Sequence, residues 1–355
     1  QHVFGDDTAF PDERWGPGWT QDDLILRAGA PASALVVNSN EISVTVSSGG
    51  EAGAPAKVEW RPDDEVYELQ NEVVTVAGDI GPADGLRFER LPGSSIVRAY
   101  GAFAVGGKPD TSNLAVEDPA LSAAWRFMRL LQERGIVVEG QHLARHRPLV
   151  LRDINREGGE GTAQPRPPGS EAAGGEIARL LPPPLIDDLH FTMKQSQNLH
   201  AEVLLRRLGL IEGEGSRADG LAIVEVMLAE SGADRNAWDL FDGSGMSVYN
   251  RLAPRMVARF LRWTTLQPWG EAFRETMPIG GVDGTLSRRF RGTSLEGRVF
   301  AKTGTLFGTN ALSGFMLTRS GKTLMFSAYA NDRPANAPSA AAAMDAALNA
   351  IALTN

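Results

Sequence analysis

The first half of the chain alternates apolar and polar residues over short runs, which Gly, Pro, Asn and Asp separate. Side chains of a strand point to opposite faces with a period of two, so such runs predict half-buried β-strands. This pattern makes residues 1–180 a β-rich region. We predict strands at residues 34–38, 41–47, 58–60, 67–76, 86–90 and 96–105.

One helix interrupts the predicted strands. Asp118 can cap its first turn, Pro119 suits the position after the cap, and Gly135 can end it. Between these residues an apolar side chain recurs every three or four positions, at Leu121, Trp125, Met128 and Leu131.

A segment rich in Gly and Pro follows the β-rich region. Residues 156–184 contain six Gly and six Pro, a composition typical of a surface loop or an interdomain connection. We therefore expect a domain boundary there, with a second region at residues 181–355.

The second region changes to a helical period. Apolar stripes predict three helices. The first covers 199–208 and would end at Gly209, the second begins after its cap Ser216, and the third covers 254–263. Strands are predicted at 298–303, 311–319 and 323–331, before an Ala-rich helix at 339–353. This order predicts helices packed on an antiparallel sheet, and hence a multidomain α+β protein.

Composition excludes several classes of function. A chain of 355 residues exceeds the usual size of one domain. The net charge of -9 argues against nucleic-acid binding, which requires concentrated positive charge. The chain has no Cys, and therefore no thiol nucleophile or disulfide, and no run approaches the ~20 apolar residues of a membrane span.

The first candidate site is Lys302-Thr303-Gly304-Thr305, at the end of a predicted strand. Its cation and two hydroxyls could hold a carboxylate, and the Gly would let a substrate backbone approach closely. Alone, the motif is explained better by a strand that leaves through a Gly turn.

The second candidate is Ser196-Gln197-Asn198, just before a helical stripe. Alone, Ser and Asn at a helix start indicate simple N-capping. The two motifs in this order, 106 residues apart, are much more specific, because Ser-x-Asn and Lys-Thr-Gly belong to the motif set of β-lactamases and penicillin-binding proteins.

Longer segments carry a family resemblance. The run from Met193 to Glu202 resembles the Ser-x-Asn region of the class C low-molecular-mass penicillin-binding proteins, which are D-alanyl-D-alanine carboxypeptidases and endopeptidases. Residues 242–247, 281–286 and 297–306 are similar to further segments of that family, in its order. Residues 10–19 and 29–35 resemble its accessory region, so the resemblance extends over nearly the whole chain.

The resemblance implies a role for each site residue. A Ser-x-x-Lys serine of the family attacks the bond between two D-alanines and forms an acyl-enzyme. Ser196 would relay a proton to the departing amine, Asn198 would bind the substrate amide, and Lys302 would attract the terminal carboxylate. Thr303 and Thr305 would bind that carboxylate beside Gly304, on a strand that pairs with the substrate, and the Thr305 N–H would form half of an oxyanion hole.

The nucleophile motif is missing. The residues three positions before the five lysines are Ala54, Val105, Phe191, Val299 and Arg319, so no Ser-x-x-Lys exists in this chain. In the family that motif precedes the inserted accessory domains. We therefore expect a chain that lacks its N-terminal part; a catalytically dead relative is the alternative.

Further expectations follow from the resemblance. The partners would be peptidoglycan stem peptides and β-lactam antibiotics, the location the periplasm or cell surface, and no metal or organic cofactor is implied. A non-catalytic domain that binds the cell wall and a β-lactamase are the competing hypotheses. His142 and His146 are interpreted as surface residues, and Asp242 and Asp283 as turn or cap residues.

Overall fold

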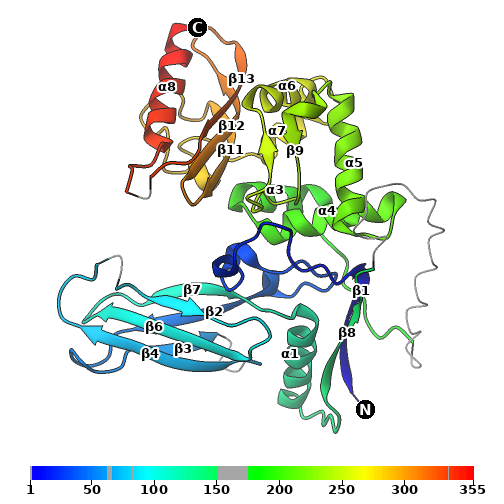
Figure 1. Ribbon diagram of the computed structural model, residues 1–355, viewed down its shortest axis with the longest axis vertical. Helices are drawn as coiled ribbons and strands as arrows, with labels where there is room; N and C mark the ends of the chain where they lie inside the picture. The colour runs from blue at the N-terminus through cyan, green and yellow to red at the C-terminus, as the bar shows by residue number, and fades with distance from the viewer. Residues whose placement is uncertain (1, 62–65, 82–83, 151–174, 335) are drawn as a thin grey trace. The chain divides into compact units, whose positions relative to one another are not determined.

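The computed structural model describes all residues except 1, 62–65, 82–83, 151–174 and 335, and divides into two compact units (Figure 1). The β-rich unit comprises Gln1–Asn155 and Glu214–Ser216, and the helix–sheet unit comprises Arg156–Gly213 and Arg217–Asn355. Most of the connection predicted at 156–184 lies outside the described residues. Residues 175–184 form no helix or strand.

The β-rich unit contains eight strands and one α-helix within the described residues. Its elements are β1 (Val3–Pro11), β2 (Glu41–Ser47), β3 (Lys57–Arg61), β4 (Glu68–Val76), β5 (Arg87–Glu89), β6 (Ile96–Ala104), β7 (Asp110–Ala115), α1 (Pro119–Glu133) and β8 (His142–Arg147).

Two three-stranded sheets enclose the main core of this unit. One has the order β3-β2-β7, and the other has the order β4-β6-β5, in which β4 and β6 run parallel. Ile42, Val44 and Val46 point inward at every second position of β2, as the alternation predicted. They pack with Val97 and Trp60 from neighbouring strands.

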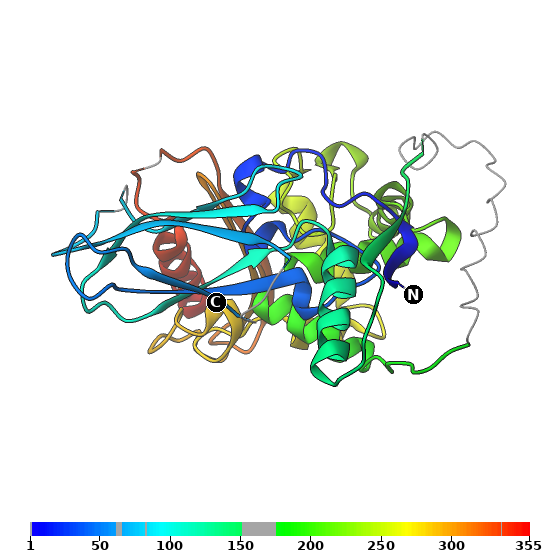
Figure 2. The same cartoon turned by 90° about the horizontal axis from the view of Figure 1, so that it is seen from below.

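A parallel pair, β1 and β8, lies beside α1, as Figures 1 and 2 both show. The contact is close at Gly5, where a Cβ atom would lie 1.9 Å from the carbonyl oxygen of Ala120. Asp118 caps α1 by accepting a hydrogen bond from the Leu121 N–H, and Gly135 follows the helix at φ 76°, which confirms the predicted helix.

Three strands of this unit were not predicted from the sequence, and one predicted strand is not present in the structure. β1, β7 and β8 carry many polar residues, and polar contacts hold β1 and β8 together where apolar alternation is absent. The strand predicted at 34–38 is wrong: this segment forms bends and a short turn.

The interpretation of His146 as a simple surface residue is also wrong. Its Nδ1 lies 2.9 Å from Asp7 Oδ1, and its Nε2 lies 3.0 Å from Asp118 Oδ2. Asp7 in turn accepts a hydrogen bond from Ser33 Oγ at 2.9 Å, and Arg14 contacts both Asp118 and the imidazole. His146 therefore joins β8, β1 and the start of α1.

The helix–sheet unit contains the remaining elements. They are α3 (Leu185–Gln195), α4 (Asn198–Glu212), α5 (Arg217–Glu230), β9 (Trp238–Asp239), β10 (Arg251–Leu252), α6 (Pro254–Thr264), α7 (Gly270–Thr276), β11 (Val299–Leu306), β12 (Thr309–Leu317), β13 (Thr323–Ala330) and α8 (Ala341–Thr354).

The antiparallel sheet β11-β12-β13 has helices on both faces (Figure 1). Val299 and Ala301 point to the face that packs against Leu348 and Ala352 of α8. Phe300, on the opposite face, packs in the core that includes Leu261 of α6. This arrangement confirms the prediction of helices on an antiparallel sheet.

Two predicted boundaries in this unit are wrong. Gly209 does not end its helix, because it is buried inside α4, which continues to Glu212. The strand predicted to end at Thr303 continues to Leu306, so the Lys-Thr-Gly motif lies within β11 and not at a Gly turn. The pattern also gave no prediction for α3 or α7.

Within the described part of the chain, every helix is too short or too polar to cross a lipid bilayer.

Candidate active site

Ser196 occupies a sharp turn between two helices. It is the C-terminal cap of α3 and adopts a left-handed conformation at φ 54° and ψ 54°, which is rare for a residue with a Cβ atom. Gln197, not Ser196, caps α4 by accepting a hydrogen bond from the Leu199 N–H, so the N-capping interpretation does not apply to Ser196. His200 Nδ1 of α4 lies 2.6 Å from Asp188 Oδ1 of α3 and helps to fix the helix pair.

The register of β11 determines where Lys302 points. Side chains alternate along a strand, so Lys302 shares a face with Phe300, which packs near Met193 of α3. Lys302 pairs in the backbone ladder with Ser313 of β12. This register directs the ammonium group toward the turn after α3, where Ser196 lies.

Ser196 and Lys302 are in direct contact. Lys302 Nζ donates to Ser196 Oγ at 2.5 Å and to the carbonyl oxygen of Thr303 at 2.8 Å. Burial lowers the pKa of Lys302 to about 8, because the surroundings remove water from the ammonium group and supply no carboxylate. Among the described residues, the ammonium group of Lys302 therefore forms hydrogen bonds with neutral oxygens and no ion pair with a carboxylate.

The rest of the motif lies along the edge of the sheet. β11 is an edge strand, and the Ala301 N–H donates outward to the carbonyl oxygen of Pro278. Backbone groups alternate in direction along an antiparallel strand, so the N–H groups of Thr303 and Thr305 point to the same outer side. Gly304 and Thr305 are exposed, which leaves this stretch open to an extended ligand.

Asn198 is the first residue of α4 and is half-buried. Asn198 lies two residues after Ser196, whose hydroxyl group accepts the hydrogen bond from Lys302.

A neighbouring loop contributes contacts that the sequence did not predict. Lys194 Nζ, two residues before Ser196, donates to Asp283 Oδ2 at 2.8 Å and to the carbonyl oxygen of Met277 at 2.7 Å. Asp283 Oδ1 accepts from the Ile279 N–H, so this residue forms an ion pair in addition to its turn contact. Gly284 at φ 53° lies so close to α3 that a Cβ atom would lie 2.7 Å from the Lys194 carbonyl oxygen.

The same loop reaches the Lys-Thr-Gly strand. Thr303 Oγ1 donates to Thr285 Oγ1 at 2.8 Å, on the face of β11 opposite Lys302. Lys194 and Thr285 are therefore site residues without a predicted role, and for Asp283 only the turn or cap role was predicted. The signal available in the sequence was the run Gly281-Val282-Asp283-Gly284-Thr285, which has the composition of a tight turn. The run does not indicate which distant residues its side chains contact.

A buried carboxyl group of α4, that of Glu202, joins this helix to the loop at Gly243 and Ser244. The side chains of Glu202 and Arg206 are both 1% exposed, and Glu202 Oε2 lies 3.7 Å from Arg206 Nη1. Glu202 Oε1 accepts hydrogen bonds from the N–H groups of Gly243 and Ser244. Burial raises the pKa of Glu202. Asp242 accepts hydrogen bonds from the Gly245 and Ser247 N–H groups, which is the predicted turn role.

The chemistry available here is that of a buried amine, a hydroxyl and an open strand edge. Within the described ranges, no three His, Asp or Glu side chains converge as metal ligands. The arrangement can attract a carboxylate, align an extended backbone and pass a proton through Ser196 Oγ.

Comparison with known proteins adds independent evidence. The model of the D-Ala-D-Ala carboxypeptidase 3 (S13) family matches residues 1–351. The D-alanyl-D-alanine carboxypeptidase of Actinomadura sp. (strain R39) is 32% identical over 350 residues, which is 95% of this chain and 60% of that protein. The D-alanyl-D-alanine carboxypeptidase DacB of Haemophilus influenzae is 27% identical over 92% of this chain and 64% of its own length.

Solved structures agree with the sequence comparison. Penicillin binding protein 4 (dacB) from Haemophilus influenzae superimposes with a TM-score of 0.77 at 25% identity, covering 96% of this chain and 72% of that chain. A second structure of the same protein, complexed with a novel β-lactam, gives a TM-score of 0.70 at 24% identity, covering 90% of this chain and 70% of that chain. The chain spans somewhat less than two thirds of the length of these curated relatives.

Proposed function

Because the chain belongs to the D-Ala-D-Ala carboxypeptidase 3 (S13) family, we propose that it is part of a serine-type D-Ala-D-Ala carboxypeptidase or endopeptidase. The substrates are the stem peptides of peptidoglycan, and the reaction proceeds through an acyl-enzyme. The observation that carries this proposal is the contact between Lys302 Nζ and Ser196 Oγ, with no carboxylate to neutralise the cation.

Lys302 attracts the terminal carboxylate of the substrate. A buried ammonium group without a counterion gains more from an incoming anion than an exposed, hydrated lysine does. When the carboxylate binds, the hydroxyl proton of Thr303 turns from Thr285 Oγ1 to the carboxylate, and the hydroxyl of Thr305 donates to the same carboxylate. Binding of the carboxylate returns the pKa of Lys302 toward its ordinary value.

The strand edge aligns the scissile bond. The substrate backbone lies along β11 as an added strand, and Asn198 binds a substrate amide. The outward N–H of Thr305 forms one half of the oxyanion hole, which stabilises the charge that develops on the carbonyl oxygen. The N–H of the nucleophile supplies the other half.

The chemical steps need a serine that these 355 residues do not supply. This serine, in a Ser-x-x-Lys segment of the longer protein, attacks the carbonyl carbon between two D-alanines. The lysine of that segment accepts the proton of the serine hydroxyl. The C–N bond then breaks, and this proton reaches the departing amine through Ser196 Oγ. Water then hydrolyses the acyl ester, which releases the shortened peptide and restores the serine.

Three further assignments belong to this proposal. β-Lactams acylate the same serine, in line with the β-lactam complex of the Haemophilus influenzae protein. Residues 1–180 form an accessory region, and residues 181–355 form the C-terminal part of the penicillin-binding domain. The protein acts in the periplasm or at the cell surface, where peptidoglycan is located.

A fluorescent penicillin tests the proposal. We expect the longer protein, with its Ser-x-x-Lys segment, to be labelled covalently at one serine and to release D-alanine from a pentapeptide substrate. The 355-residue chain should stay unlabelled. Labelling of this chain alone would contradict our assignment of the nucleophile, and rapid multiple-turnover hydrolysis of a chromogenic cephalosporin would favour a β-lactamase.

A further inference from the structure

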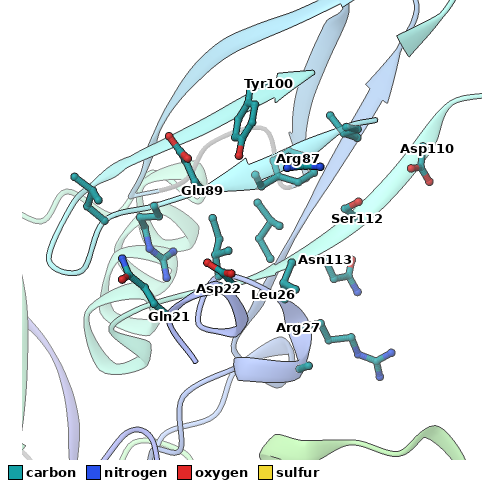
Figure 3. A pocket seen from close by; sticks show the side chains of 17 residues that line it. Gln21, Asp22, Leu26, Arg27, Arg87, Glu89, Tyr100, Asp110, Ser112 and Asn113 are labelled. Carbon is teal, nitrogen blue, oxygen red and sulfur yellow. The ribbon is translucent and has the colours of Figure 1, made fainter. Parts of the chain in front are cut away.

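The β-rich unit contains an open groove of about 750 Å³ (Figure 3). This volume lies within the range of about 300–1,000 Å³ that is usual for ligand-binding pockets. Arg87 and Tyr100 lie on one side of the groove, and Asp22 and Leu26 lie on the other. All of its lining residues belong to this one unit.

The groove lies between the edges of two sheets. β5 is the edge strand of one sheet and β7 is the edge strand of the other. Residues 21–28, which include the 3-10 helix η1 (Gln21–Asp23), close the groove on the third side. The Ala115 N–H donates to the Ile25 carbonyl oxygen, so this third side is joined to β7 by the backbone.

The lining offers apolar surface on both sides of the groove. Leu26 is 44% exposed and Leu91 is 71% exposed, although both line a concave surface. The aromatic ring of Tyr100 also lines the groove, and the guanidinium carbon of Arg98 lies 4.7 Å from its ring centroid. Such a surface suits the C–H face of a flat ring in a ligand.

The polar groups of the lining balance one another in charge. The lining contains the basic residues Arg27, Arg87 and Arg90 and the acidic residues Asp22, Glu89 and Asp110. The side-chain carboxylates of Asp22 and Asp110 form no hydrogen bond or ion pair with other described residues, and both residues are exposed and line the groove. This balance does not favour a strongly charged ligand such as a polyphosphate, whereas the two carboxylates can each accept hydrogen bonds from hydroxyl groups.

We propose that this groove binds a neutral, polyhydroxylated chain, an oligosaccharide with N-acetyl groups. Sugar hydroxyls both donate and accept, so they match a lining where carboxylates, an amide and guanidinium groups alternate. The apolar residues receive the ring faces and the acetyl methyl groups. Given the proposed function, the ligand is the glycan strand of peptidoglycan, which the accessory region holds while the active site cleaves the attached peptides.

The 355-residue chain is sufficient for the test. An oligomer of β-1,4-linked N-acetylglucosamine serves as the probe, because it has the glycan backbone without any stem peptide. Isothermal titration should detect saturable binding, and the amide NMR signals of β5 and β7 should shift. The double variant Asp22→Ala/Asp110→Ala should bind about tenfold more weakly, which corresponds to the loss of one hydrogen bond to a charged group.

Asp79→Ala is the matched control, because Asp79 is an exposed acid of the same unit outside the groove. Thermal unfolding of both variants checks that they fold. Absence of oligosaccharide binding, equal binding by the double variant, or preferential binding of a free stem peptide would overturn the glycan assignment. Penicillin labelling of the longer protein is independent of this groove, so a failure here leaves the proposed function intact.

Discussion

The two units place a basic side chain in opposite electrostatic surroundings. In the β-rich unit, His146 lies between the carboxylates of Asp7 and Asp118. In the helix–sheet unit, Lys302 contacts a hydroxyl and a carbonyl oxygen. Burial lowers the pKa of both groups, but the two carboxylates outweigh burial and raise the pKa of His146, whereas that of Lys302 falls to about 8.

This difference separates a structural charge from a functional one. The charge of His146 is satisfied by side chains of its own unit, so it has no electrostatic demand left for a ligand. The charge of Lys302 is costly until an anion arrives, and it lies beside an open strand edge. Perturbed basic groups of the second kind mark binding sites more reliably than those of the first.

The largest effect should come from removal of the Lys302 charge. In the longer protein, Lys302→Ala should slow acylation by penicillin about 100- to 1000-fold, the usual cost of one lost electrostatic contact to the transition state. Stopped-flow or gel measurement of the acylation rate checks this. Lys322→Ala, an exposed lysine of the same unit, is the control and should acylate at the original rate.

The pH profile sharpens this prediction. Lys302 carries a proton below its pKa of about 8 and loses it above. Binding of the carboxylate, and with it the rate of acylation, should therefore fall as the pH rises through about 8. This pH dependence should be absent in Lys302→Ala. A profile that is flat to pH 10 in the original protein would contradict the assigned charge of Lys302.

A smaller effect should follow from release of the loop beside the site. Lys194→Met removes the bond to Asp283 that fixes the loop against α3, just before Ser196. We expect acylation to be about tenfold slower, because the misplaced contacts raise the activation free energy by about 1.4 kcal/mol. The pH dependence of acylation that Lys302 causes separates a positioning role from a folding role. Its midpoint should shift in the Lys194→Met variant.

A double-mutant cycle with Asp283→Asn tests the same pair. If the two residues act together, the double variant should be scarcely slower than either single variant. Fully additive losses would show that Lys194 and Asp283 act separately.

The smallest effect should appear in the β-rich unit. Because the pKa of His146 is raised above 6.5, its ion pairs stabilise the fold fully below pH 6.5 and are lost as the pH rises through the higher pKa of the folded state. His146→Asn should cost about 1 kcal/mol at pH 6 and much less at pH 9, as measured by urea unfolding. Asp12 also faces this cluster and adds to the rise in the pKa of His146, while Arg14 pairs with both Asp12 and Asp118.

His142→Asn is the matched control in the same strand. It should leave the pH dependence of unfolding unchanged, because the ion pairs with Asp7 and Asp118 are formed by His146. An equal loss in both variants would assign the effect to the strand β8 rather than to the carboxylates around His146.

Parts of this fold could be predicted from local pattern. β2, β4 and β6 alternate apolar and polar residues against one buried face, and α1 and α8 have clear helical stripes or composition. β1 and β8 could not be predicted, because ion pairs between residues about 140 positions apart replace apolar contacts there. Gly209 was a misleading stop signal, because packing inside the unit overrides the low helix propensity of Gly.

By itself, the sequence determined the residue types of the site, their order, the absence of Ser-x-x-Lys and the alternation that makes β11 a strand. Only the tertiary structure decided that Lys302 points toward Ser196, that Lys194 pairs with Asp283, and that Thr285 contacts Thr303. The physical reason is that strand register and the left-handed turn at Ser196 are fixed by packing between distant segments. Local propensity carries no information about those distances.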